Sequence, residues 1–465
     1  MPRLTPEFLR RAASVDVHLP LLLRYCRDLS SARNELRWLK EHAHILAATS
    51  VPKNGPSAIL LKQSKKTKSL AALTDRRNVG ALENKILARM VYQRSRGRPL
   101  QYILGSQPFG NLEIQCREGV LIPRPETETY TEQVSQILSQ LIPVLVNDPT
   151  SSIRQNKRIR ILDLCTGSGC IALLLHSLLK PPSGTTAPFP AVAANGLSIE
   201  ILGIDISERA VNLARLNLQY NIKKGLLHPD AARDIHFTRR DIRDLNSVPG
   251  GVSIETITSE GRETQAYFTS DLETQSLTDG SWDVIVSNPP YISGKELTRS
   301  GVVEKSVRKY EPRLALVPPD DDGCDPQDRG TPDLFYRLLV QIARKVDASL
   351  LVMEVGDTEQ ANRVLRIAHR ELAYSGNDIL LESWRDDSSV RPGNNLGTIT
   401  HDPERAPVTS EEEISDRAVI SWRGNWGRWR RDTSTPPVIT THQQATRPPR
   451  GIREQGLETR NHDLG

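Results

Sequence analysis

The chain is poor in aromatic residues and has no long apolar run. Aromatic residues make up 5% of the 465 residues and the net charge is only +5, so the composition does not by itself predict a nucleic-acid partner. No apolar run approaches the ~18 residues that a membrane span needs. The run from Leu19 to Leu23 stops at Arg24 and is too short for the core of a secretory signal.

The cysteines and histidines do not form a metal or disulfide pattern. The cysteines are odd in number and include no Cys-x-x-Cys pair, which argues against a disulfide framework or a zinc ribbon and favours a reducing compartment. His42 and His44 are two residues apart and would point to different sides of a helix, so we expect no metal site. The five cysteines are Cys26, Cys116, Cys165, Cys170 and Cys324.

The first part of the chain has the pattern of a small helical domain, which we assign to residues 1–97. Residues 49–69 contain proline, glycine and a cluster of four lysines at positions 62, 65, 66 and 68, and they predict an exposed linker. The arginines near the start, among leucine and alanine, are typical of a mitochondrial presequence, whereas Glu7 and Asp16 are not. An ordinary amphipathic helix is the other reading. We expect a mitochondrial location, with the cytoplasm as the alternative.

Residues 98–128 predict a β-hairpin connector. Alternating apolar residues and turn residues indicate short strands at Leu100–Leu104, Leu112–Gln115 and Val120–Ile122. A helix from Glu126 to Leu145 follows.

From residue 129 to 431 apolar strands alternate with helices, which predicts a doubly wound, mostly parallel α/β sheet. Ligands bind such sheets beyond the carboxyl ends of the strands. We expect surface insertions at 180–198, 245–280 and 318–330, and a disordered tail at 432–465. The expected strands are Arg160–Leu164, Ile199–Ile204, Ile235–Thr238, Trp282–Ser287, Ser349–Val355 and Ala418–Trp422; the expected helices are Ile171–Leu179, Glu208–Asn221 and Pro332–Val346.

A glycine turn follows the first of these strands and precedes a helix. Its glycines let the backbone approach a ligand closely, and the helix start offers free N–H groups. Asp163 at the strand end would attract the cationic methionine end of S-adenosylmethionine and repel a pyrophosphate, so it favours this cofactor over the NAD that a GxGxxA pattern also fits. The candidate cofactor residues here are Asp163, Gly167, Ser168, Gly169, Cys170 and Ile171, with the two cysteines that flank the turn read as packing residues.

Two further acids end the next two strands. Asp205 can accept hydrogen bonds from the ribose hydroxyls of an adenosine. Asp241 can accept from the adenine amino group, with Ile242 against the ring. The gap between the glycine turn and Asp205 exceeds the usual distance of about 20 residues, and the 180–198 insertion explains the excess.

The most specific signal is Asn288-Pro289-Pro290-Tyr291 after an apolar strand. The prolines force an extended corner whose carbonyls have no local partner. The Asn288 oxygen and the Pro289 carbonyl can accept the two hydrogens of a planar NH₂ group, on which Tyr291 can stack. Catalysis of methyl transfer to that nitrogen would then come from positioning and electrostatics.

The motifs together resemble the release-factor glutamine N5-methyltransferases of the HemK type, over about residues 30–425. Besides the glycine turn and the Asn288–Tyr291 box, four segments carry the resemblance: Arg98-Pro-Leu-Gln-Tyr-Ile-Leu-Gly105, Leu121-Ile-Pro-Arg-Pro-Glu-Thr-Glu128, Val307-Arg-Lys-Tyr-Glu-Pro312 and Met353-Glu-Val-Gly356. The Leu121–Glu128 segment is the discriminator, because DNA amino-methyltransferases share the Asn-Pro-Pro-Tyr box without it. The run Ala32-Arg-Asn-Glu-Leu-Arg-Trp38 is similar to the fungal mitochondrial branch.

The resemblance implies a helical N-terminal domain, a β-hairpin connector and a Rossmann-like, seven-stranded class I methyltransferase domain. It implies that the substrate is the glutamine of the Gly-Gly-Gln loop in a peptide-chain release factor. By motif match, residues Gly167 to Ile171, Asp205, Asp241 or Ile242, and Asn288 would hold the cofactor. Asn288 to Tyr291 would hold the glutamine amide, and Arg124, Glu126 and Glu128 would line or brace the pocket.

Two other functions remain open on the sequence. A nucleic-acid amino-methyltransferase would share the glycine turn and the Asn288–Tyr291 box, because a base amine is also a planar NH₂ group, but it would need a basic, aromatic groove. The one aromatic-basic cluster, at Trp422–Arg430, follows an expected strand and is better explained by packing and solvated charge. A non-catalytic cofactor-binding protein would not need the intact Asn288.

Overall fold

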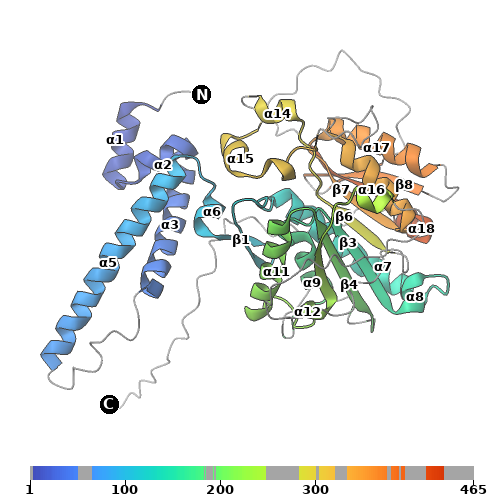
Figure 1. Cartoon of the computed structure of the whole chain (residues 1–465), viewed down its shortest axis with the longest axis horizontal. Coiled ribbons are helices and arrows are strands. Elements are labelled where there is room, and N and C mark those ends of the chain that lie inside the picture. The colour runs from blue at the N-terminus through green and yellow to red at the C-terminus, as the bar shows by residue number, and fades with distance from the viewer. Residues whose placement is uncertain are drawn as a thin grey trace, which may run out of the picture. The chain divides into compact units, whose positions relative to one another are not determined.

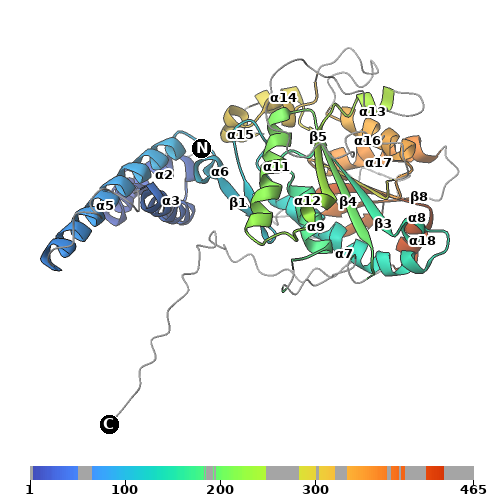
Figure 2. The same cartoon turned by 60° about the horizontal axis from the view of Figure 1, so that its bottom comes forward.

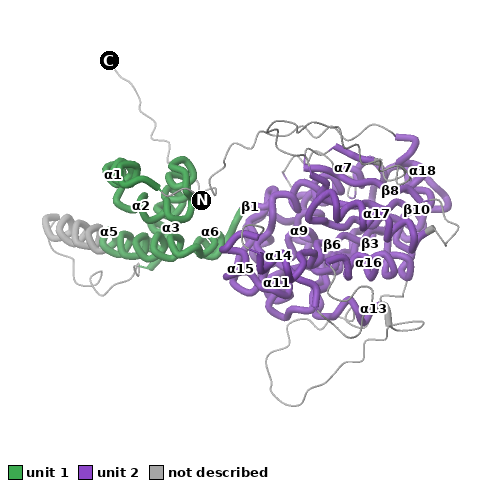
Figure 3. Tube along the Cα trace, turned by 90° about the horizontal axis from the view of Figure 1, so that it is seen from above, with its two compact units in different colours: residues 1–107, 440–465 green, residues 108–439 purple. Residues whose placement is uncertain are grey.

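In the computed structural model of the protein, the described residues are 4–50, 65–182, 184, 192, 195–247, 282–299, 303–319, 332–373, 379–386, 389–392 and 415–433. They fall into two compact units that divide between Gln107 and Pro108 (Figure 3). The expected insertions at 180–198, 245–280 and 318–330, the tail at 432–465 and the linker at 49–69 lie largely outside the described residues.

The first unit is helical (Figure 1). Helix α5 begins at Lys65, inside the segment expected to be a linker, because the lysines there are good helix formers and are followed by Leu and Ala. Its elements are α1 (Pro6–Val15), α2 (Leu19–Cys26), α3 (Leu29–Ser50), α5 (Lys65–Ser95) and α6 (Leu100–Leu104).

The arginine-bearing N-terminal helices are part of this unit's core. Ala12 of α1 and Leu19, Leu22 and Leu23 of α2 are buried in one cluster with residues of α3 and α5. This segment therefore packs as helix in the core of the unit.

Two of the three strand predictions for the connector are wrong. Leu100–Leu104 is the short helix α6, which ends at Gly105 in the left-handed conformation with φ of 82°. Val120–Ile122 is irregular backbone. The hairpin itself is formed by β1 (Ser106–Phe109) and β2 (Leu112–Gln115) in a two-stranded sheet.

The second unit is built on one eight-stranded sheet of order β5-β4-β3-β6-β7-β10-β8-β9. The neighbouring strands β5, β4, β3, β6 and β7 are parallel to one another, and β10 is antiparallel to both β7 and β8. Seven of these strands make up the expected class I sheet, and the three-residue edge strand β9 is the eighth. Their bounds are β3 (Arg158–Leu164), β4 (Ser198–Asp205), β5 (Ile235–Arg239), β6 (Val284–Ser287), β7 (Leu350–Glu354), β8 (Ile379–Arg385), β9 (Val390–Pro392) and β10 (Asp416–Arg423).

Helices cover both faces of this sheet (Figure 2). One large buried cluster joins the sheet to α7 (Pro125–Asn147), α9 (Cys170–Leu179) and α11 (Glu208–Lys223). A second cluster joins it to α16 (Leu334–Lys345) and α17 (Thr358–Ala373). The shorter elements are α8 (Ser152–Asn156), α12 (Ala231–Asp234), α13 (Asp244–Ser247), α14 (Gly294–Thr298), α15 (Lys305–Tyr310), the 3₁₀ turn η2 (Arg313–Ala315) and α18 (Gly424–Asp432).

Most of the aromatic-basic cluster at Trp422–Arg430 is buried, whereas Arg428 is exposed. Trp422 and Trp426 are buried in the first of these clusters. Arg430 is also buried and donates from Nε to Glu382, 3.1 Å away. The sequence suggested that this charge would be solvated, but it is paired inside the protein. None of the helices in the described part of the chain has the length and apolarity of a membrane crossing.

Candidate active site

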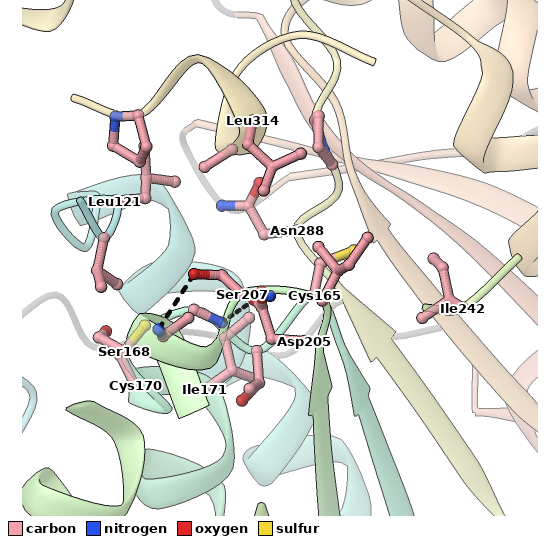
Figure 4. A pocket seen from close by; sticks show the side chains of 18 of the residues that line it. Leu121, Cys165, Ser168, Cys170, Ile171, Asp205, Ser207, Ile242, Asn288 and Leu314 are labelled. Carbon is pink, nitrogen blue, oxygen red and sulfur yellow. Dashed lines mark hydrogen bonds between the residues drawn. The ribbon is translucent and has the colours of Figure 1, made fainter. Parts of the chain in front are cut away.

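A pocket opens at the carboxyl ends of the parallel strands, where the polar motifs were expected (Figure 4). Nine of the candidate residues line it: Gly167, Ser168, Cys170, Ile171, Asp205, Asp241, Ile242, Asn288 and Pro290. Four do not: Asp163, Gly169, Pro289 and Tyr291. The first group provides pocket surface that a ligand would contact, whereas the second group is not part of the pocket lining.

The glycine turn connects β3 to α9 in the way that its sequence requires. Gly169 has φ of 78°, and a Cβ there would lie 2.9 Å from Phe237 Cζ and 3.0 Å from Ala214 Cβ. Gly167 has φ of 55°, and a Cβ there would meet nothing closer than 4.0 Å within the protein. Gly169 therefore permits close packing inside the protein, and Gly167 leaves space on the pocket side.

Asp163 lies behind the turn. Its side chain is fully buried, and its Oδ2 accepts hydrogen bonds from Thr166 Oγ1 at 2.6 Å and from the Ala172 backbone N–H at 3.3 Å. Burial raises the pKa of Asp163 to about 7, against the opposing effect of these donors. Asp163 thus fixes the turn and the start of α9 from inside, and it does not line the pocket as a partner for a cation.

Asp205 ends β4 and faces the pocket. Oδ2 accepts from the Gly167 backbone N–H at 2.9 Å, and Oδ1 accepts from the Ser207 backbone N–H at 2.8 Å. Burial raises the pKa of Asp205. Each carboxylate oxygen can accept a second hydrogen bond. Asp205 can therefore hold the glycine turn against the end of β4 and still accept hydrogen bonds from ligand hydroxyls.

Asp241 lines the pocket next to an arginine that sequence reasoning overlooked. Burial alone would raise its pKa, but hydrogen bonds from Arg243 lower the pKa of Asp241 below its usual value. Arg243 donates to Asp241 from Nη2 at 2.6 Å and from its backbone N–H at 2.9 Å. The adjacent Ile242 is buried and lines the same part of the pocket.

The Asn288 box follows β6 directly, and Asn288 points into the pocket (Figure 4). Its Nδ2 donates to Thr127 Oγ1, 3.3 Å away, and Thr127 Oγ1 in turn donates to Glu354 Oε2 at 2.6 Å. Thr127 lies at the start of α7, within the Leu121–Glu128 segment, and Glu354 ends β7. Neither contact could be found from sequence spacing.

Tyr291 is anchored behind the pocket. Its hydroxyl donates to Glu354 Oε1 at 3.2 Å, and Gln360 Nε2 donates to its backbone carbonyl at 3.2 Å. A Cβ on Gly356 would lie 3.2 Å from the Tyr291 ring, so a larger residue there would require the ring to shift by a few tenths of an ångström. The structure therefore gives Tyr291 an anchoring contact in place of a position in the pocket lining.

The Leu121–Glu128 segment forms one wall of the pocket. Arg124 Nη2 donates to Glu311 Oε1 at 2.8 Å, and the Ile122 backbone N–H donates to Glu311 Oε2 at 3.1 Å. Glu311 is buried and directly precedes the wall residues Pro312, Leu314 and Ala315. One carboxylate thus joins two segments that both contribute to the pocket lining.

The cysteines at the pocket are packing residues in the structure. Cys165 and Cys170 are free thiols, and burial raises the pKa of both above the usual value for cysteine. Both thiols would therefore stay protonated near neutral pH and would be poor nucleophiles.

The chain is similar to methyltransferases from fungal mitochondria and from bacteria. It is 32% identical, over 279 residues, to the probable MRF1 mitochondrial N(5)-glutamine methyltransferase mtq1 of Schizosaccharomyces pombe, with 58% of this chain and 68% of that protein covered. It is 28% identical to the mitochondrial MRF1 N(5)-glutamine methyltransferase MTQ1 of Saccharomyces cerevisiae, with 79% and 80% covered. A release factor glutamine methyltransferase of Thermodesulfovibrio yellowstonii is 28% identical, with 60% and 71% covered.

The family model of the Eco57I restriction-modification methylase matches residues 200–313. This span contains Asp205, Asp241 and the Asn288 box, but not the glycine turn or the Leu121–Glu128 segment. It is thus the part of the chain that an amino-methyltransferase acting on DNA would share, and it does not separate the two classes of substrate.

Proposed function

Because this chain belongs to the family of release-factor glutamine N5-methyltransferases, we propose that it methylates a glutamine side-chain amide with S-adenosylmethionine as the donor. The acceptor in this proposal is the glutamine of the Gly-Gly-Gln loop in a mitochondrial peptide-chain release factor. The observation that carries the proposal is that Asn288 and the glycine turn, far apart in sequence, line one pocket together with the Leu121–Glu128 segment.

The pocket fits the proposed cofactor. S-adenosylmethionine supplies a methyl group that is electrophilic because it is bonded to a sulfonium. Gly167 leaves room for close approach of the ligand, and Asp205 retains acceptor capacity for ribose hydroxyls. Ile206 and Ile242 offer apolar surface for an adenine ring, and Asp241 offers an acceptor beside it.

The Asn288 box would orient the acceptor nitrogen. An amide nitrogen is a weak nucleophile because its lone pair is delocalised into the carbonyl group. The Asn288 side-chain oxygen and the Pro289 carbonyl would each accept one hydrogen of the NH₂ group, which aligns the nitrogen and stabilises positive charge that develops on it during transfer. No covalent bond to the enzyme is needed.

A nucleic-acid amino-methyltransferase, acting on adenine N6 or guanine N2, is the second candidate, since the restriction-methylase model matches residues 200–313. The basic and aromatic residues that could have supported it at Trp422–Arg430 are largely buried. We therefore expect nucleic acid not to be a substrate.

The direct test is methyl transfer from labelled S-adenosylmethionine to three acceptors: a mitochondrial release factor, the same factor with its Gly-Gly-Gln glutamine changed to alanine, and bulk DNA or RNA. We expect label only on the unaltered factor. Label on nucleic acid, or equal label on both forms of the factor, would contradict the proposal.

A further inference from the structure

The Asn288 side chain is connected to a buried acid through one hydroxyl. Glu354 is 2% exposed, and its two carboxylate oxygens each receive a hydroxyl: Thr127 Oγ1 at 2.6 Å on Oε2 and Tyr291 OH at 3.2 Å on Oε1. Thr127 Oγ1 is also the acceptor for Asn288 Nδ2, at 3.3 Å. Three elements far apart in sequence, α7, β6 and β7, thus meet through these side chains.

The direction of the hydrogen bonds in this connection follows when Glu354 is ionised, and burial raises the pKa of Glu354 to about 7. A hydroxyl has one hydrogen, and an ionised carboxylate can only accept. When Thr127 gives its hydrogen to Glu354, its oxygen can only accept from the Asn288 side chain. Asn288 must therefore turn its NH₂ group toward Thr127, and its Oδ1 is left facing the pocket.

We propose that Glu354 and Thr127 are positioning residues that set the orientation of the Asn288 amide, so that an acceptor oxygen and not an NH₂ group faces the substrate. This inference rests on the proposed function, because an acceptor oxygen is what a substrate NH₂ group requires. With the Asn288 amide reversed, two N–H groups would face each other and the substrate nitrogen would lose one of its two acceptors. The same carboxylate anchors Tyr291, so both ends of the Asn288–Tyr291 box depend on Glu354.

The primary test compares Thr127→Val with Thr127→Ser. Valine has nearly the shape of threonine but can neither donate nor accept, whereas serine keeps the hydroxyl. We expect Thr127→Val to lower kcat by about tenfold to a hundredfold, as loss of one oriented hydrogen bond in the transition state does, and Thr127→Ser to remain within about threefold of wild type. The Kd for S-adenosylmethionine, measured by calorimetry, should change little in either variant.

Thr131→Val is the matched control. Thr131 is a buried threonine one turn further along α7, and its hydroxyl donates to the Thr127 backbone carbonyl at 2.6 Å without contacting Asn288. We expect its kcat to stay within about twofold of wild type at temperatures below unfolding. Equal losses in Thr131→Val and Thr127→Val would show a merely structural role and would overturn the inference, as would a Thr127→Val enzyme with wild-type kcat or a Thr127→Ser enzyme as impaired as Thr127→Val.

Glu354→Gln gives an independent variant if Thr127→Val does not fold. Its amide offers one oxygen in place of two, so only one of Thr127 and Tyr291 can still donate to it, and we expect kcat to fall by about tenfold. Unchanged kcat in Glu354→Gln would overturn the inference. Wild-type transfer is measured first: absence of transfer to the release factor would overturn the proposed function, and these variants would then be compared on the acceptor that is methylated.

Discussion

At the residue scale, the two glycines of the turn have different tasks. A Cβ at position 169 would collide with Phe237 and Ala214, whereas position 167 lines the pocket and a Cβ there would meet no protein atom closer than 4.0 Å. We expect Gly169→Ala to lower the free energy of unfolding by about 2 kcal/mol or more, through the clash together with the positive φ, and Gly167→Ala to lower it by about 1 kcal/mol.

The loss of S-adenosylmethionine binding should be larger for Gly167→Ala than for Gly169→Ala, which is the opposite order to the loss of stability. We expect Gly167→Ala to weaken S-adenosylmethionine binding at least tenfold by calorimetry, because its methyl group occupies space that the ligand needs. Denaturant unfolding gives the stabilities. A Gly167→Ala protein that binds the cofactor as well as wild type would show that the ligand does not approach this turn.

Asp163 leads to a prediction about pH. Its pKa in the folded protein, about 7, lies above its usual value of 3.8, so between these values the folded carboxyl keeps a proton that the unfolded carboxyl has lost. Its contribution to the free energy of unfolding therefore falls as pH rises through this range, by roughly 1.4 kcal/mol per pH unit. Asp163→Asn has no such charge, so we expect its stability relative to wild type to increase by about 2–3 kcal/mol from pH 5 to pH 7. A difference independent of pH, measured by denaturant unfolding, would contradict this assignment.

The sequence predicted which residues lie near the pocket better than it predicted which of them line it. Asp205, Asp241 and Asn288 line the pocket, whereas Asp163 and Tyr291 are held behind it. All five follow or end a strand, so the pattern could predict the edge of the sheet at which they lie. Which of them face a ligand depends on contacts with distant partners such as Glu354, and no local pattern records these contacts.

At the element scale, the pocket wall depends on a single carboxylate. Glu311 accepts from the Arg124 guanidinium and the Ile122 backbone N–H, and Glu311→Ala would leave the partly buried guanidinium and the buried backbone N–H without this acceptor. We expect Glu311→Ala to lower the free energy of unfolding by about 2–3 kcal/mol and to weaken cofactor binding, because the two wall segments would lose the carboxylate that joins them.

Thermal unfolding with and without S-adenosylmethionine measures both effects of Glu311→Ala. A variant with reduced stability but the wild-type stabilisation by ligand would show that the wall does not shape the cofactor site.

The element predictions that failed share a physical cause. Leu100–Leu104 and Val120–Ile122 are apolar stretches too short for their periodicity to separate strand from helix or loop. In the structure Leu100 and Tyr102 are buried in a five-residue helix, and Val120 packs against Ala210 and Leu213 of α11. Tertiary packing therefore decided the conformation of these stretches, whereas the strands β3 to β7 and the helices α9, α11 and α16 were predicted to within a few residues.

At the scale of the whole molecule, the sequence predicted the alternation of strands and helices but not the composition of the last part of the sheet. Strand β8 and helix α17 were not predicted, and β10 pairs between β7 and β8 from a position later in the chain than either. This insertion of a late strand into the middle of the sheet is a long-range contact that local patterns do not encode. Buried Glu382, which accepts from Trp422 Nε1 at 2.8 Å and from Arg430, joins β8, β10 and α18 in this region.

The central claim is that the pocket presents an acceptor oxygen of Asn288 to the amide of a release-factor glutamine. The measurement that tests it most directly is tandem mass spectrometry of the release factor after reaction with wild-type enzyme and with Asn288→Ala. We predict one methyl group on the side-chain nitrogen of the Gly-Gly-Gln glutamine with wild-type enzyme, and at least a hundredfold less with Asn288→Ala. Methylation of a different residue, or undiminished methylation by Asn288→Ala, would contradict the account.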